Sequence, residues 1–570
     1  MPTITRRPYP ATLPDWPLPA LLTRLYVSRG VASPAELEKS ARALAPYTAL
    51  QGIDEAVRLL AEAIAANRRI VIVGDFDADG ATSSALCLLA LRQLGARQVD
   101  FLVPNRFEYG YGLSPEIVDV AIARGAELLI TVDNGISSHS GVAAAKAAGL
   151  QVLITDHHLP GDTLPAADAI VNPNLQSCRF PSKALAGVGV AFYLMLALRA
   201  HLREQGTFAT GQEPNLAQLL DIVALGTVAD VVPLDANNRI LVHQGLNRIR
   251  AGQCRPGILA LCEVAGREPG QLAASDLGFF LGPRLNAAGR LDDMALGVSL
   301  LVTDDQHQAR LMAAELDSLN RERREIESSM QQEALAELDK LTLDAVPAGI
   351  ALYREDWHQG VIGILASRIK ERFHRPVVAF APASDTELKG SGRSIPGLHL
   401  RDLLDELDTR EPGLILKFGG HAMAAGLSIG HDQFARFNAA FSALAEEKLD
   451  AHMLTGEILS DGELLPTEFT LATAQLLREG GPWGQAFPEP VFDGHFKVVS
   501  QRIVGQKHLK LVLSPSAGGE PLLDAIAFNC DLDTWPNPAI NWVRAAYKLD
   551  INHYRGRQSV QLLLDYLEPA

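Results

Sequence analysis

The stretch from residue 70 to residue 93 constrains the fold more than any other part of this chain. Its apolar, β-branched start, Ile70–Val73, predicts a buried strand. Gly80 permits a sharp turn, and Ala81–Gln93 has the composition of a helix. A buried strand that leads through a short turn into a helix is typical of an open parallel α/β sheet, where ligands bind beyond the carboxyl ends of the strands. Between strand and turn stand three alternating aspartates, Asp75, Asp77 and Asp79.

These three aspartates are too close together for an ordinary turn. Carboxylates at such spacing repel one another unless a cation lies between them. The alternative is an Asx-rich turn that caps the helix, but one aspartate would suffice for a cap, and an Asx turn requires no alternation. We therefore interpret the three aspartates as metal ligands.

Strands and helices alternate regularly from residue 70 to about residue 230. Two later strands also end in polar side chains, one in Asp133 and the next in Asp156, His157 and His158. Alternation of this kind predicts βαβ units in a parallel sheet, so the three strand ends should meet at one edge. The predicted strands are 70–73, 99–103, 128–132, 152–155 and 169–171, and the predicted helices are 55–67, 115–124 and 139–148.

A further carboxylate follows a predicted helix at 216–229. Asp230 stands directly after this helix, which Pro233 stops. By itself, Asp230 is only an acid at a helix end. Beside the acids and histidines of the strand ends it becomes a candidate ligand.

Carboxylates with some imidazole suit Mn²⁺ or Mg²⁺ rather than zinc. The candidates exceed what one ion with bound water needs, so we expect two ions about 3.5–4 Å apart with a bridging carboxylate. Such a pair activates a water and stabilises a leaving oxygen, which is the chemistry of phosphoester hydrolysis. The predicted metal ligands are Asp75, Asp77, Asp79, Asp133, Asp156, His157, His158 and Asp230, and those with predicted catalytic roles are Asp77, Asp79, Asp133, His157 and His158.

The rest of the chain is predicted to form a long helix, a second α/β unit and a small barrel. Asp304–Leu341 contains no proline or glycine and repeats apolar residues at helical spacing, which predicts an amphipathic helix about 55 Å long. About five strands with polar turns fit an OB-like barrel, a fold that often binds single strands. The predicted domains are a cap at 1–50 packed on the first domain, with helices at 21–25 and 34–44, a catalytic domain at 51–303, the connecting helix at 304–345, a second α/β domain at 346–450 and the barrel domain at 455–570.

Two glycine-rich stretches of the second α/β unit, 389–394 and 417–426, are predicted as turns. Glycines let backbone N–H groups approach an anion closely, and arginine can bind a phosphate through two hydrogen bonds. We expect a phosphate-binding role here, and the alternative is a pair of ordinary turns. The candidate contacts are Ser391, Arg393 and His421 in these stretches, Arg290 in a separate glycine-containing stretch, and Tyr109, which is placed to stack a base or to anchor its loop.

Composition narrows the class of protein. The chain has 570 residues and a formal net charge of −16, which argues against a generally basic nucleic-acid-coating protein but not against a local basic groove. Its five cysteines are scattered and have no zinc-site spacing, which is typical of a reducing cytoplasm. We expect no signal peptide, because residues 1–8 have no apolar core, and no membrane span, because the most apolar run, 188–198, is too short.

The motifs together resemble the DHH phosphoesterase family. The resemblance rests on GDFDADG (74–80), VDNG (132–135), TDHH (155–158) and VADVVPL (228–234) in this order, and GGHAMAAG (419–426) is similar to the DHH-associated domain. NAAGRL (286–291) and GSGRSIPG (390–397) are similar to the branch of this family that degrades single-stranded DNA. The resemblance covers nearly the whole chain from about residue 20.

This resemblance implies a parallel-sheet DHH domain, a long helix, a DHH-associated α/β domain and an OB-like barrel. It implies hydrolysis of single-stranded DNA from the 5′ end to 5′-mononucleotides with Mg²⁺ or Mn²⁺, in recombination and repair. The implied partners are single-strand-binding protein and a RecQ-type helicase, and we expect a monomer. Ser391, Arg393, His421 and Arg290 match positions that contact DNA, but the match does not separate metal ligands from substrate contacts.

Two other functions remain open from the sequence. A phosphodiesterase for short oligonucleotides or cyclic dinucleotides, or a pyrophosphatase, can use the same metal site and needs no barrel. A binding scaffold with an inactive centre is the other alternative. The intact set of acids argues against a scaffold, which has no reason to keep repelling carboxylates together.

Overall fold

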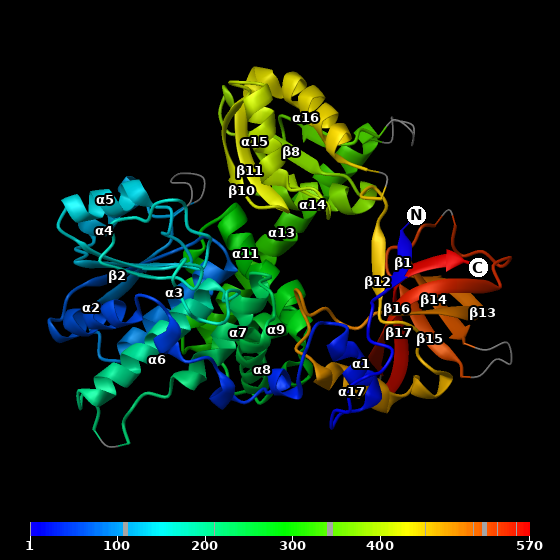
Figure 1. The fold of residues 1–570 in the computed structure, drawn as a ribbon, viewed down its shortest axis with the longest axis horizontal. Coiled ribbons are helices and arrows are strands. Elements are labelled where there is room, and N and C mark those ends of the chain that lie inside the picture. The colour runs from blue at the N-terminus through cyan, green and yellow to red at the C-terminus, as the bar shows by residue number, and fades with distance from the viewer. Residues whose placement is uncertain are drawn as a thin grey trace. The chain divides into compact units, whose positions relative to one another are not determined.

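A computed structural model describes residues 2–105, 112–209, 211–338, 346–450, 452–505, 507–515, 521–532, 534–554 and 556–570 (Figure 1). The chain divides into two compact units, one of Met1–Thr5 with Ser318–Ile458 and the other of Arg6–Asp317 with Leu459–Ala570. The division falls within α13 (Gln306–Leu338), the long helix that the sequence predicts. The last three residues of the predicted helix, 339–341, lie outside the described residues.

The larger unit contains the predicted parallel sheet. Its strand order is β3-β2-β4-β5-β6, and every neighbouring pair is parallel. The carboxyl ends of all five strands therefore lie at one edge. The strands are β2 (Ile70–Gly74), β3 (Val99–Leu102), β4 (Leu128–Val132), β5 (Gln151–Thr155) and β6 (Ala169–Val171).

Helices cover both faces of this sheet (Figure 1). α4 (Pro115–Ala123) and α5 (His139–Ala147) pack on one face, while α2 (Ile53–Ala65), α3 (Ala78–Gln93) and α6 (Gly187–Glu204) contact the other. Because both faces are covered, β2 and β4 are buried at every residue, as their continuous apolar sequences predict. No helix among the described residues combines the length and apolar content needed to cross a membrane.

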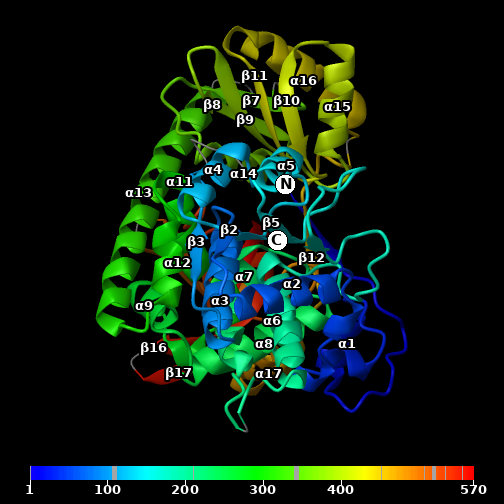
Figure 2. The same cartoon turned by 90° about the vertical axis from the view of Figure 1, so that its left-hand side faces the viewer.

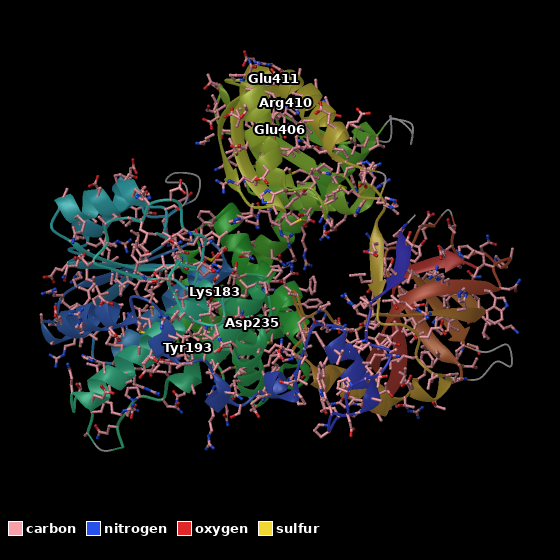
Figure 3. All side chains as sticks on the ribbon, in the orientation of Figure 1. Lys183, Tyr193, Asp235, Glu406, Arg410 and Glu411 are labelled. Atoms are coloured by element: carbon pink, nitrogen blue, oxygen red, sulfur yellow. The ribbon has the colours of Figure 1, made fainter. Side chains whose placement is uncertain are left out.

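A layer of helices follows the sheet. The sequence predicts one of these helices, at 216–229. α7 ends at Ala229 as predicted, but a 3₁₀ turn precedes it at Leu216–Leu219. Asp235 caps α8 by accepting a hydrogen bond from the Asn238 N–H, and the Tyr193 hydroxyl donates to Asn237 (Figure 3). The helices of this layer are α7 (Leu220–Ala229), α8 (Ala236–Arg250), α9 (Pro256–Val264), α10 (Ala274–Asp276), α11 (Gly282–Leu291) and α12 (Ala295–Val302), with a π-helical segment at Leu277–Leu281.

The N-terminal segment contacts more than the first domain. It contains β1 (Thr3–Arg6) and α1 (Ala20–Val27), but the helix predicted at 34–44 is wrong, because 3₁₀ turns at Pro34–Leu37 and Ala41–Ala43 replace it. Proline and serine interrupt that stretch and favour turns. The segment packs on α8 through Arg239, which donates to the Glu36 carbonyl, and α1 contacts the residues before the barrel.

The smaller unit contains a second, mixed sheet of order β10-β11-β9-β8-β7. The prediction of two glycine-rich turns is wrong for most of both stretches, because 387–393, 415–420 and 424–430 form strands that pair antiparallel, while 421–423 connect the last two. A Cβ at Gly390 would overlap the Phe380 ring, so this glycine serves close packing across the sheet. The strands are β7 (Ile350–Tyr353), β8 (Val377–Pro382), β9 (Glu387–Arg393), β10 (Ile415–Gly420) and β11 (Ala424–Gly430).

Helices cover both faces of this second sheet as well. α15 (Leu400–Arg410) and α16 (Phe434–Lys448) pack together on one face (Figure 2). α14 (Ile362–Phe373) and the last turns of α13 share a separate apolar core with β7 and β8. Arg410 on α15 pairs with Glu406 and with Glu447 of α16 at the exposed side (Figure 3).

The predicted five-stranded barrel is confirmed. Its order is β13-β14-β15-β17-β16, and the sheet closes. β12 (Glu457–Ser460), which pairs with β1, and α17 (Leu471–Gly480) precede the barrel, so the barrel itself begins at Phe492. Its strands are β13 (Phe492–Val504), β14 (His508–Ser514), β15 (Leu523–Ala527), β16 (Trp542–Tyr554) and β17 (Arg557–Pro569).

Arg29 joins the N-terminal segment to the residues that lead into the barrel. Its side chain is fully buried and donates to both carboxylate oxygens of Asp461 at 2.8 Å and to the Pro488 carbonyl at 2.8 Å. Its guanidinium also lies over the Trp483 ring, 5.2 Å from the centroid.

We expect Arg29→Ala to lower the melting temperature by several degrees. Breaking a buried ion pair by removing one partner costs about 3–5 kcal/mol, because the other charge stays buried. Arg58→Ala is the control, since Arg58 is exposed and lies 3.7 Å from Glu55, with which it forms an exposed ion pair. Equal melting temperatures for the two variants in calorimetry would contradict a structural role of the Arg29 contacts.

Candidate metal centre

The three predicted strand ends meet at one edge of the parallel sheet. Asp75 follows β2, Asp133 follows β4 and Asp156 follows β5, and these strands are neighbours. The side chains of this edge and Asp230 form three groups that share members. Within each group, the potential ligand atoms lie within 4.8 Å of one another. The groups are Asp75, Asp77 and Asp133; Asp79, His157 and Asp230; and Asp133, His157 and His158.

Asp77 is both a helix cap and a member of this cluster. Its Oδ1 accepts hydrogen bonds from the N–H groups of Asp79 at 2.9 Å and Gly80 at 3.0 Å. α3 therefore begins at Ala78, three residues earlier than predicted, and Gly80 is helical rather than a turn residue. A Cβ at Gly80 would overlap the Asp75 carbonyl oxygen, so the glycine permits close approach of the helix to the preceding strand end.

Asp79 is buried against the start of α6. Its carboxylate accepts hydrogen bonds from the N–H groups of Gly187 at 2.6 Å and Val188 at 2.9 Å. These bonds favour the charged form, but burial and the nearby charge of Asp77 outweigh them and raise the pKa of Asp79 to about 7. Without a cation, this carboxyl group resists ionisation.

Asp133 and Asp230 show the same effect. Asp133 is buried, with φ at +61° in the left-handed region, and Asp230 is the residue directly after α7. Burial and the charges of neighbouring aspartates raise the pKa of each carboxyl group well above its usual range. Several carboxylates of like charge are thus held together. A divalent cation would offset both the cost of burying these charges and their mutual repulsion.

His157 faces these carboxylates with one ring nitrogen. Burial and the charge of His158 lower the pKa of His157 to about 4, so the ring is neutral at pH 7. Nε2 makes no hydrogen bond to any described residue, and the ring's other nitrogen bonds to the Leu185 carbonyl. Nε2 lies within 4 Å of three carboxylate oxygens, from Asp133 at 3.1 Å, Asp230 at 3.5 Å and Asp79 at 3.9 Å.

This arrangement fits a metal ion. A neutral imidazole that donates through Nδ1 to a carbonyl directs the Nε2 lone pair at the carboxylates, where it is repelled. The buried Oδ2 of Asp230 likewise makes no hydrogen bond within the described residues. A divalent cation between these atoms would convert each repulsion into a ligand bond, and carboxylate with imidazole suits Mn²⁺ or Mg²⁺.

Asp156 lies outside the three groups, and hydrogen bonds engage both of its carboxylate oxygens. Its Oδ1 accepts from the N–H groups of His157 and His158 and from Nδ1 of His158 at 2.7 Å, while its Oδ2 accepts from the Ile136 N–H. Burial disfavours the charged forms of Asp156 and His158, but the hydrogen bond and the attraction between them outweigh it. The pKa of His158 therefore rises to about 8, and that of Asp156 falls below its ordinary value. These contacts support a positioning role, and ligation by Asp156 stays a prediction.

α11 packs on the loop that carries the first aspartates. Asn286 Oδ1 accepts a hydrogen bond from the Ala78 N–H at 2.8 Å, and a Cβ at Gly289 would overlap the Phe76 carbonyl oxygen. The next residue, Arg290, is half-buried. The NAAGRL motif thus supports this loop directly. The sequence could not show this contact, because 208 residues separate Ala78 from Asn286.

The candidate phosphate contacts Ser391, Arg393 and His421 lie in the smaller unit. Arg393 Nη1 donates to Ser391 Oγ at 3.1 Å on β9, and burial lowers the pKa of Arg393. His421 is exposed between β10 and β11, and its N–H donates to the carbonyl of Ala424, which is opposite Arg393 in the register. The sheet therefore places Ser391 and Arg393 on β9, beside the β11 end that follows His421, whereas Tyr109 lies outside the described residues.

A cavity of about 590 Å³ lies in the larger unit between α7, α8 and the segment that leads into the barrel. Val228 and Val231 line it on either side of Asp230 in the sequence, but none of the predicted ligands does. The arrangement of side chains, rather than this cavity, therefore marks the candidate metal centre.

Comparison with known proteins agrees with this architecture. Three family models match: the N-terminal domain of the DHH family at residues 69–227, the DHHA1 domain at 347–447 and the RecJ OB domain at 460–566. The single-stranded-DNA-specific exonuclease RecJ of Dickeya dadantii (strain 3937) is 65% identical over 99% of this chain and 99% of its own length. The same exonuclease of Escherichia coli (strain K12) is 63% identical over 97% of this chain and 96% of its own length. This chain belongs to the RecJ family.

Solved RecJ structures share the fold. A crystal structure of RecJ from Thermus thermophilus in complex with Mn²⁺ matches with a TM-score of 0.78 and 30% identity, over 96% of this chain and 76% of that one. The same RecJ in complex with Mg²⁺ matches with a TM-score of 0.73 and 29% identity, over 96% and 74%. The predicted combination of parallel sheet, second α/β domain and OB-like barrel is therefore confirmed.

For this RecJ-family chain we expect stabilisation by Mn²⁺ to grow with pH. A carboxyl group whose pKa is raised in the fold stabilises the metal-free fold fully below its unfolded pKa of about 3.9. That contribution is lost as pH rises through the folded pKa, about 7 for Asp79. Mn²⁺ requires deprotonated carboxylates, so the increase in melting temperature on adding Mn²⁺ should be larger at pH 8 than at pH 5.

Thermal unfolding with and without Mn²⁺ at both pH values checks this expectation. Asp168→Asn is the control, because Asp168 pairs with Lys146 outside the cluster, and it should keep the pH dependence. Asp133→Asn should weaken the pH dependence of the stabilisation by Mn²⁺. An Mn²⁺ effect in the wild type that does not change between pH 5 and pH 8 would contradict a centre of buried, protonated carboxyl groups.

Proposed function

We propose that this chain is a metal-dependent exonuclease that hydrolyses single-stranded DNA from its 5′ end and releases 5′-mononucleotides. The observation that carries the proposal is the buried cluster of carboxylates around His157 Nε2, in a chain whose RecJ relatives match it over nearly their full length. A role in DNA recombination and repair follows from the same family. The class of reaction is phosphodiester hydrolysis.

Two divalent ions, Mn²⁺ or Mg²⁺, are the proposed cofactors. One would be held by Asp75, Asp77 and Asp133, and the other by Asp79, His157 and Asp230, as the two groups of ligand atoms suggest. Asp133 also belongs to the group with His157 and His158, which suits it to bridge the two ions. Ions bound there polarise the phosphodiester and lower the pKa of a water.

The chain's own residues orient and protect this chemistry. Burial of Asp75, Asp79 and Asp133 limits the contact of these carboxylates with water and strengthens electrostatic interactions there. Asp156 engages Nδ1 of His158 at 2.7 Å, so Nε2 is the nitrogen of that ring proposed to contact an ion or a phosphoryl oxygen once the ring is neutral. The bond to Asp156 fixes the direction of the ring and, in the neutral form, keeps the proton on Nδ1.

DNA contacts are proposed for residues that are not among the predicted metal ligands. Arg290, next to the loop that α11 supports, and Ser391, Arg393 and His421 of the smaller unit are proposed to bind phosphates of the strand. The barrel is proposed to hold the strand farther from the 5′ end, as OB-folds commonly do. Tyr109 stays a prediction.

A phosphodiesterase for short oligonucleotides or cyclic dinucleotides is the second candidate. The match of residues 460–566 to the RecJ OB domain favours the exonuclease, because a small substrate needs no such barrel. Single-strand-binding protein and a RecQ-type helicase as partners, a monomeric state and a cytoplasmic location stay predictions.

The decisive experiment uses single-stranded oligonucleotides blocked at the 5′ or the 3′ end, digested with Mn²⁺. We expect the 3′-blocked strand to be degraded to mononucleotides and the 5′-blocked strand to survive, as read by chromatography. Asp77→Asn should lose hydrolysis while it still binds single-stranded DNA. Degradation of the 5′-blocked strand alone, or activity confined to dinucleotides, would contradict the proposal.

Arg393→Ala should slow degradation from the 5′ end about thirtyfold in kcat/KM. A hydrogen bond to a charged group contributes about 1.5–3 kcal/mol, and 1.4 kcal/mol corresponds to a factor of ten. Arg410→Ala is the control, because Arg410 lies in the same unit and pairs with Glu447 at its exposed surface. A loss of melting temperature in Arg393→Ala that accounts for the whole loss of activity would indicate a structural role instead.

A further inference from the structure

The loop after β6 holds the backbone of the two adjacent histidines. Asn174 Nδ2 donates to the His157 carbonyl at 2.6 Å, and Asn172 Nδ2 donates to the His158 carbonyl at 2.9 Å. The two asparagines are themselves linked, because Asn172 Oδ1 accepts a hydrogen bond from the Asn174 N–H at 2.8 Å. Residues 172–174 thus form one hydrogen-bonded unit that faces the histidine pair.

Lys183 anchors this loop from the other side. Its ammonium group donates to the Pro173 carbonyl at 2.6 Å and to the Cys178 carbonyl at 2.8 Å (Figure 3). Asn172 is fully buried and Pro173 is buried, so the loop is held by packing as well. The donors that reach the histidine carbonyls therefore come from a rigid support.

Both the N–H groups and the carbonyl groups of His157 and His158 are engaged in hydrogen bonds. Asp156 accepts hydrogen bonds from the N–H groups of His157 and His158, and the two asparagines donate to their carbonyls. With donors and acceptors both engaged, none of the three peptide groups from Asp156 to Leu159 can rotate without breaking a hydrogen bond. The direction of the His157 ring, and with it the position of Nε2 near three carboxylates, depends on these peptide groups.

We infer that Asn174 is a positioning residue for the metal centre, which it serves by fixing the backbone of His157. This inference rests on the proposed function, because it assigns Asn174 a role toward the proposed ions. Asn174 is the suitable residue to test, since it is only half-buried and its amide makes one hydrogen bond to the histidine pair. Water can replace the amide donor in a variant, so the fold should tolerate the change while the ring loses its fixed direction.

The experiment compares Asn174→Ala and Asn174→Asp with the wild-type full chain. Asn174→Asp has nearly the same shape, but it places an acceptor against the His157 carbonyl. We expect the Kd for Mn²⁺, measured by electron paramagnetic resonance of the free ion, to rise about tenfold or more in both variants, as for other residues that orient metal ligands. Activity at limiting Mn²⁺ should fall and recover at high Mn²⁺, with the KM for single-stranded DNA and the metal-free melting temperature unchanged.

Asn247→Ala is the matched control. Its amide also contacts a histidine, but at the ring nitrogen of His243 on α8, 2.9 Å away, and neither residue belongs to the carboxylate cluster. The Mn²⁺ affinity of Asn247→Ala should therefore equal that of the wild type. An unchanged Kd for Mn²⁺ in both Asn174 variants would overturn the inference. So would a fall in metal-free melting temperature large enough to explain the weaker binding. Wild-type protein that binds no Mn²⁺ would instead remove the proposed metal centre itself.

Discussion

Repulsion among buried carboxylates is the constraint on which the rest of this structure depends. Asp79 and Asp133 are buried, Asp230 is half-buried beside them, and burial and like charge raise the pKa of each of the three. A fold gains nothing from such a cluster by itself, since burial and like charge both oppose ionisation. The cluster makes physical sense only as a cation site, and the surrounding elements are arranged to keep it in place.

Three parts of the chain that are distant in sequence hold the cluster together. The start of α6 donates two backbone N–H groups to Asp79, α11 supports the loop after β2, and the loop after β6 holds the histidine backbone. The parallel sheet supplies the common edge, because neighbouring strands end side by side. Rigid support of this kind is what a catalytic metal centre requires, because small displacements of its ligands weaken both binding and chemistry.

Much of this centre could be predicted from the sequence. Strand periodicity placed Asp75, Asp133 and Asp156 at strand ends, and regular alternation with helices predicted that the ends meet. Local pattern could not separate ligands from supporting residues: Asp156 is engaged entirely by hydrogen bonds, and Asn174 stands in an ordinary turn sequence. Those roles depend on contacts between segments distant in sequence. For the same reason the glycine-rich stretches 389–394 and 417–426 were predicted as turns, although most of each forms strands and Gly390 packs closely against Phe380.

The most direct measurement is anomalous diffraction from crystals grown with Mn²⁺ and recorded at the manganese absorption edge. Two peaks should appear within ligand distance of the cluster, one beside Asp75 and Asp77 and the other beside Asp79 and His157, with Asp133 between them. A map with no peak among these side chains, or with manganese bound only elsewhere, would contradict the claim that the buried carboxylates exist to hold divalent ions.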